Sequence, residues 1–74
     1  MAVPGRLNEA IAEYEEALRL RPDIAQIHLN LAIALLELPG QTHEAALHLR
    51  AALRLEPGNS QAHDILSTIE AREP

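Results

Sequence analysis

Residues 23–57, DIAQIHLNLAIALLELPGQTHEAALHLRAALRLEP, contain two apolar stretches separated by a Pro-Gly pair. In both stretches the apolar residues recur at steps of three and four, which places their side chains on one face of an α-helix. Pro39 and Gly40 together form a turn signal. The segment therefore predicts two amphipathic helices joined by a tight turn.

The segments on either side carry the same periodicity. Before residue 23, a stripe of apolar residues runs from Leu7 to Leu18, and Pro22 ends it because the residue before a proline avoids the helical region. After residue 57, Asn59 or Ser60 can cap a further helix; Asp23 and Thr42 are the expected caps of the two central helices. The sequence predicts one all-α domain over residues 1–74, an antiparallel helix-turn-helix array of four helices. The expected helices cover residues 6–21, 24–38, 42–56 and 60–72.

The expected helix over residues 24–38 is apolar on more than one side. Its main stripe, which we expect to face the core, contains His28, Leu31 and Leu35. A second stripe, at Leu29, Ile33 and Leu36, is expected to face outward. A helix with two apolar sides is either central in a fold or carries a binding surface.

The chain aligns with itself, without a gap, when it is shifted by 35 residues. A repeat of this length is typical of solenoids built from two-helix units. Small residues recur at equivalent places and would let the helices approach closely. The matching positions include Pro4-Gly5 with Pro39-Gly40, Ala10 with Ala45, Ala17 with Ala52, Pro22 with Pro57, His28 with His63 and Leu31 with Leu66.

The repeated positions resemble the tetratricopeptide repeat (TPR), whose signature spaces small and large residues over two helices and closes with a proline. The resemblance implies a superhelix in which one full repeat is flanked by two half repeats. The residues that carry it are His28, Leu31-Ala32, Leu35, Ala45, Leu49, Ala52 and Pro57 in the full repeat, Ala10, Tyr14, Ala17 and Pro22 before it, and His63, Leu66-Ser67 and Glu70 after it.

Solenoids usually need about three repeats and polar end helices, and the sequence shows neither. We therefore expect apolar surface at one end of the array to be covered by another copy of the chain. That surface consists of Leu7, Ile11, Tyr14 and Leu18 at one end, or of Ile65 and Ile69 at the other.

Composition limits the function classes. A net charge of -5 with no lysine argues against a nucleic-acid or anionic-membrane partner. The longest apolar run is too short for the roughly 20 residues that cross a bilayer. With no charged-then-apolar leader either, a soluble, cytoplasmic protein is the default expectation.

Four histidines invite a metal hypothesis, but their spacing does not favour one. His43 and His48 are five residues apart, so on a helix they point about 140° from each other. We expect His43 and His48 to be exposed, and His28 and His63 to be packed against neighbouring helices. The sequence has no cysteine, no phosphate-binding glycine loop and no evident pair of catalytic carboxylates. We expect no enzyme activity, no metal and no cofactor.

The resemblance implies that ligands lie in the groove formed by the first helices of successive repeats. The groove positions in this sequence are Gln26, Leu29, Asn30, Ile33, Leu36 and Glu37, followed by Asp64 and Thr68. A clamp for a peptide carboxylate is not expected, because Leu29 and Asp64 stand among these positions and only Arg72 supplies a cation.

Two hypotheses follow for the function. The first is a protein-interaction or self-assembly module that binds a peptide, a helix or another copy of the chain in the groove. The alternative is a piece of the TPR region of a larger enzyme, such as a glycosyltransferase, with catalysis elsewhere.

Overall fold

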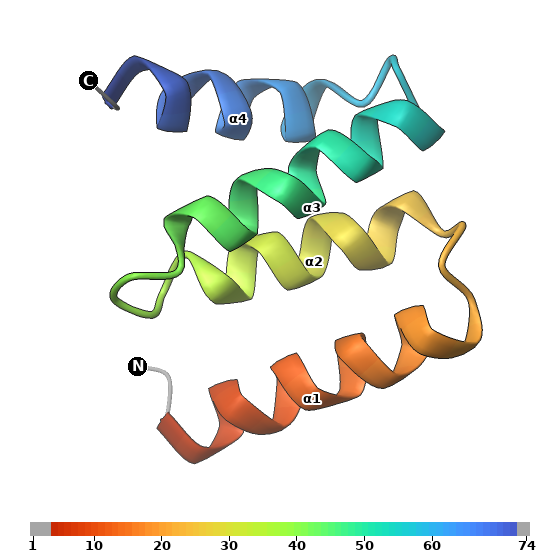
Figure 1. Cartoon of the computed structure of the whole chain (residues 1–74), viewed down its shortest axis with the longest axis vertical. Helices are drawn as coiled ribbons and strands as arrows, with labels where there is room; N and C mark the ends of the chain where they lie inside the picture. The colour runs from red at the N-terminus through yellow and green to blue at the C-terminus, as the bar shows by residue number, and fades with distance from the viewer. Residues whose placement is uncertain (1–3, 73–74) are drawn as a thin grey trace.

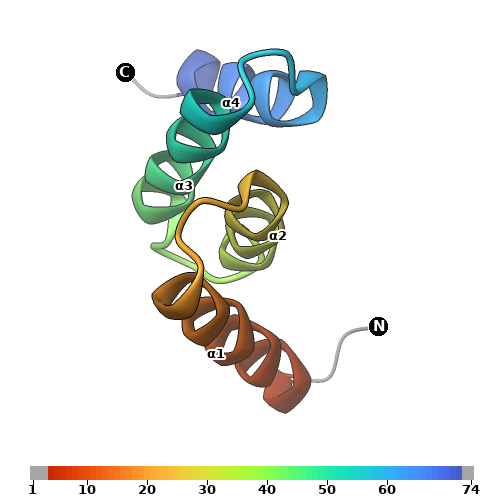
Figure 2. The same cartoon turned by 90° about the vertical axis from the view of Figure 1, so that its right-hand side faces the viewer.

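The chain folds into four α-helices in an antiparallel array, in a computed structural model that describes residues 4–72 (Figure 1). No strand occurs among these residues, so the all-α prediction is confirmed. Successive helices are neighbours: α2 and α3 pack most extensively, while α1 lies against α2 and α4 against α3. Figure 2 shows α1 and α4 at opposite ends, with the α2–α3 pair between them. The helices are α1 (Pro4–Leu20), α2 (Ala25–Leu35), α3 (Thr42–Leu55) and α4 (Ser60–Arg72).

The ends of α1 and α2 differ from the predicted ends. Helix α1 begins at Pro4, since proline fits the first helical turn, where its missing N–H would have no partner. Helix α2 ends at Leu35 instead of residue 38. Beyond it, the N–H groups of Glu37 and Leu38 donate to carbonyls three residues back, at 3.1 and 3.0 Å. The chain then turns through Gly40, whose φ of 77° suits glycine.

The predicted side-chain caps of the two central helices are wrong. Ile24 is the N-cap of α2 and makes no capping bond with its side chain. Asp23 therefore lies one residue too early to cap, and its Oδ1 is 3.7 Å from Arg21 Nε instead. Gln41 is the N-cap of α3 and likewise makes no capping bond with its side chain. Thr42 is already the first residue of that helix.

The predicted cap of the last helix is confirmed at Asn59. Its Oδ1 accepts a hydrogen bond of 2.9 Å from the backbone N–H of Ala62. This bond satisfies one of the N–H groups that the first turn of α4 leaves free.

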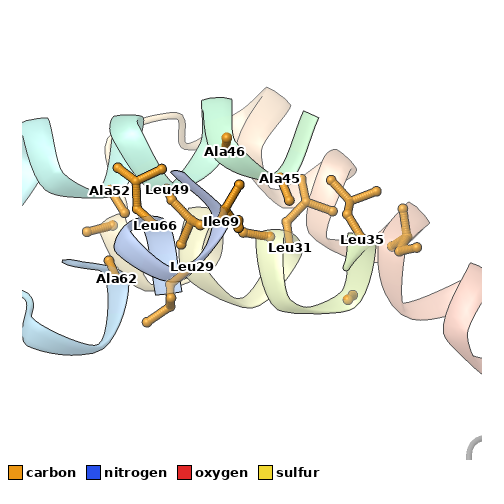
Figure 3. Packing of buried hydrophobic residues seen from close by; sticks show 14 residues of the cluster. Leu29, Leu31, Leu35, Ala45, Ala46, Leu49, Ala52, Ala62, Leu66 and Ile69 are labelled. Carbon is orange, nitrogen blue, oxygen red and sulfur yellow. The ribbon is translucent and has the colours of Figure 1, made fainter. Parts of the chain in front are cut away.

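The core lies chiefly between α2 and α3. Leu29, Leu31 and Leu49 are the largest fully buried side chains, and Ala45 and Ala52 of α3 have no exposed surface. Figure 3 shows the core side chains of α2 and α3 gathered together, with Leu66 and Ile69 of α4 beside them. Burying one such leucine contributes about 1.5–3 kcal/mol. The alanines let the helix backbones approach and the leucines interlock around them.

The predicted outward stripe of α2 is wrong at Leu29. This side chain is only 1% exposed and belongs to the core. Ile33 and Leu36, from the same stripe, are half-buried and pack against that core. Because α2 has helical neighbours on two sides, its apolar residues are covered around most of its circumference.

Replacing Ala45 by leucine tests the close approach of α2 and α3. We expect Ala45→Leu to lower the free energy of unfolding by about 1–3 kcal/mol, because the added atoms have no free space. Urea unfolding followed by circular dichroism measures the change. The control is Ala12→Leu at an exposed position of α1, which should leave stability nearly unchanged. Equal stabilities of the two variants would contradict the tight packing.

Candidate functional site

An open pocket of about 220 Å³ lies between α1 and α2. Its lining residues recur at steps of three and four on each helix, so two helical ridges face each other across it. The lining residues are Leu7, Ala10 and Tyr14 of α1 and Asn30, Ile33, Ala34 and Glu37 of α2 and the turn after it.

The pocket combines an apolar surface with a few polar groups. Leu7, Ile33 and Tyr14 are half-buried and pack against the core with part of their surface open. Asn30 is half-buried and Glu37 is exposed. Apolar concavities with a small number of fixed polar groups are typical of recognition sites.

The structure brings three of the predicted groove residues together in this pocket: Asn30, Ile33 and Glu37. A fourth, Gln26, supports them from the preceding turn of α2. Its Nε2 donates a hydrogen bond of 3.0 Å to Asn30 Oδ1, so the Asn30 amide is oriented and its NH₂ group is left to point outward.

The remaining predicted groove residues lie elsewhere. Leu29 is in the core, and Leu36 packs against it without lining the pocket. Asp64 and Thr68 are exposed on α4, where Thr68 Oγ1 donates to the Asp64 carbonyl at 3.0 Å. Helix α4 is at the opposite end of the array from α1 (Figure 1).

The sequence-based groove missed the contribution of α1, namely Leu7, Ala10 and Tyr14. It assigned ligand contacts only to the first helices of the repeats, and α1 is a second helix in that scheme. For two of the three residues, a signal was present in the sequence: they belong to the apolar stripe that was expected to be surface covered by another copy. Leu7 and Tyr14 belong to both sets.

Two histidines meet at the α2–α3 contact. His28 Nδ1 lies 3.1 Å from His48 Nδ1, and His28 Nε2 lies 2.9 Å from the carbonyl oxygen of Pro22. A carbonyl only accepts, so His28 Nε2 carries the proton and donates to it. When the His28 ring is neutral, its Nδ1 then carries no proton and accepts a hydrogen bond. His48 donates this bond from its Nδ1–H.

The four histidines depart in part from their predicted environments. His28 is half-buried against α3, which confirms its packing, and His43 is exposed as expected. His48 was expected to be exposed but is half-buried beside His28. His63 was expected to be packed but is exposed, because no described helix covers the face of α4 that corresponds to the α3-facing side of α2.

Burial lowers the pKa of His48 below its ordinary value of 6.5, and the neighbouring His28 lowers it further. Glu44 and Glu15 act in the opposite direction but more weakly. Glu44 Oε2 lies 3.6 Å from His48 Nε2, the nitrogen that takes up the proton. The lowered pKa favours the neutral form of His48, in which its Nδ1–H donates to His28 Nδ1.

The described residues contain no group of three or more His, Cys, Asp or Glu side chains placed to hold a metal ion. Within the same part of the chain, no helix has the length and apolar character that crossing a bilayer requires.

The lowered pKa of His48 makes stability depend on pH. The unfolded chain takes up this proton at its ordinary pKa of 6.5, whereas the folded chain does so only at lower pH. The free energy of unfolding should therefore fall as the pH is lowered below 6.5. Urea unfolding across that range measures it. His48→Gln should flatten the dependence, while His43→Gln, an exposed site on the same helix, should keep it. Equal slopes in both variants would contradict the assignment.

In a comparison with protein families, residues 4–38 match the family model for the TPR repeat. This segment contains α1, α2 and the residues that line the pocket. Comparisons with curated proteins and with solved structures give no significant match. The match to residues 4–38, on a four-helix antiparallel array, supports the assignment of the chain to the tetratricopeptide repeat family.

Proposed function

We propose that this chain is a protein-interaction module that receives an amphipathic helix or peptide of another protein in the pocket between α1 and α2. TPR repeats generally mediate protein–protein interactions. The observation that carries the proposal is the apolar pocket itself, which is formed within the matched repeat.

The size of the pocket favours a peptide over a small-molecule ligand. Small-molecule sites usually enclose about 300–1,000 Å³ and bury most of their ligand. This pocket is about 220 Å³ and open, which suits one or two apolar side chains of a larger partner. Binding energy in such interfaces is concentrated in a few anchors of this kind.

The polar groups at the pocket add specificity to the apolar contact with a partner. The oriented Asn30 amide offers hydrogen bonds at the pocket, and Glu37 offers a carboxylate. Together with the acidic balance of the chain, these groups favour partners with a hydrogen-bond acceptor for the Asn30 NH₂ group or a positive charge beside their apolar anchors.

A peptide with the sequence of residues 23–37 is a suitable probe, because α2 is an apolar helix that already packs against helices of this fold. We expect the labelled peptide to bind the protein in fluorescence anisotropy and to shift amide NMR signals of Leu7, Ala10 and Tyr14. In the protein, the substitution Ile33→Glu should weaken peptide binding about tenfold, or ~1.4 kcal/mol, because it places a charge on the apolar surface of the pocket.

The matched control is Thr68→Glu, the same change at the exposed position of α4 that corresponds to Ile33 in the 35-residue repeat. It should leave the affinity unchanged. Circular dichroism confirms that both variants are folded. Unaltered binding by folded Ile33→Glu, or NMR shifts confined to α3 and α4, would overturn the proposed site.

A further inference from the structure

The two faces of α3 show how a helix of this repeat packs on both sides. His48 meets His28 of α2, and Arg50 Nη2 lies 3.2 Å from Glu70 Oε2 of α4. Ala45 and Ala52 share the stripe of His48, at steps of three and four, and neither has any exposed surface. The face with Ala45, His48 and Ala52 is therefore the one that α2 covers.

The same face recurs on α1, where no described helix covers it. The 35-residue shift places Ala10, Glu13 and Ala17 on Ala45, His48 and Ala52. Ala10 and Ala17 are half-buried and Glu13 is exposed. Helix α1 packs on α2 through its other side, where Ile11 is buried. The pocket opens beside the uncovered face, since Ala10 lines it.

We propose that the partner is an amphipathic helix that packs on this face of α1 as α2 packs on α3. This partner helix runs antiparallel to α1. It carries a cationic side chain (Arg, Lys or protonated His) at the position equivalent to His28 of α2. This inference rests on the proposed function of the pocket and names the chemistry of its partner.

The charge requirement comes from Glu13 and Glu9. Glu13 stands where α3 has His48, whose Nδ1 lies 3.1 Å from His28 Nδ1. Glu9 stands where α3 has Glu44, whose carboxylate lies 3.6 Å from His48 Nε2. In the described structure neither Glu9 nor Glu13 has an ion-pair partner. A side chain at the His28 place thus meets the Glu13 carboxylate, with the Glu9 carboxylate one turn away on the same face of α1. A cation there pairs with Glu13 and is attracted by Glu9.

A second copy of the chain does not supply this helix well. Its α4 corresponds to α2, but polar residues stand where α2 has buried ones: Asp64 for Leu29 and Glu70 for Leu35. Burying a carboxylate against an apolar helix is costly. Glu70 is also already paired with Arg50 of α3. A separate partner with an apolar stripe fits the face better.

Two peptides of residues 23–37 test the charge requirement, one with His28→Arg and one with His28→Glu. Wild-type protein should bind the arginine peptide about fivefold more tightly than the glutamate peptide, the range expected for a partly exposed ion pair. Glu13→Lys should invert this order. The control Glu15→Lys changes net charge equally, but Glu15 is exposed and lies on the opposite side of α1 from Glu13, about 200° around the helix, so the wild-type order should remain.

The orientation is tested with a spin label at the N-terminus of the arginine peptide. An antiparallel helix should broaden the amide signals near Leu20, at the end of α1, and not those near Leu7. Broadening near Leu7 would overturn the orientation.

Three further outcomes separate the inference from the proposed function. Equal binding of both peptides to wild type and Glu13→Lys would overturn the inference and leave the pocket as a peptide site. No binding of any peptide would overturn both. If sedimentation shows self-association that Ile33→Glu abolishes, the occupant is a second copy and the inferred partner is wrong.

Discussion

The close contact between α2 and α3 is the interaction on which the rest of the structure depends. Ala45 and Ala52 give α3 a surface without side-chain bulk, and Leu31 and Leu49 fill the space around them. With one aromatic residue in the chain, the core has no large ring to bridge a wider gap between helices. Short interaxial distances are therefore the way in which this composition reaches the packing density of a protein interior.

Because of this contact with α3, the two sides of α2 have different roles. Its side toward α3 is committed to the core, and its side toward α1 supplies the residues of the pocket. The polar side of the site is consequently carried by one of the two central helices of the array, with Asn30 held by Gln26 on the same helix. Recognition groups on a rigid element lose little conformational entropy when a partner binds.

Much of the fold could be predicted from the sequence, because periodicity and repetition are local and internal properties. The four helices, the turn at Gly40 and the alanine contacts followed from residue spacing. What spacing could not provide was the neighbour of each helical face. Leu29 and Ile33 belong to one predicted stripe, yet only Leu29 is fully covered.

The histidines show that residue spacing also does not predict which side chains of the site are packed and which are exposed. His28 and His63 occupy equivalent places in the repeat, but one is held between Pro22 and His48 and the other is exposed. Their environments depend on the helix packed against them, which the repeat pattern does not specify. The contribution of α1 to the pocket was missed for this reason as well: Leu7 and Tyr14 were predicted as apolar end surface but not assigned to the groove.

The bond between His28 and His48 has a consequence for the alignment of α2 along α3. A slide by one helical turn would bring leucine to the places of the buried alanines, so the apolar packing already disfavours it. Among the described residues this is the only side-chain hydrogen bond that joins the two helices. Sliding would leave both ring nitrogens without a partner in a half-buried place, at a cost of about 1–3 kcal/mol for each unsatisfied group. This polar contact therefore adds to the apolar packing in fixing the register of the interface.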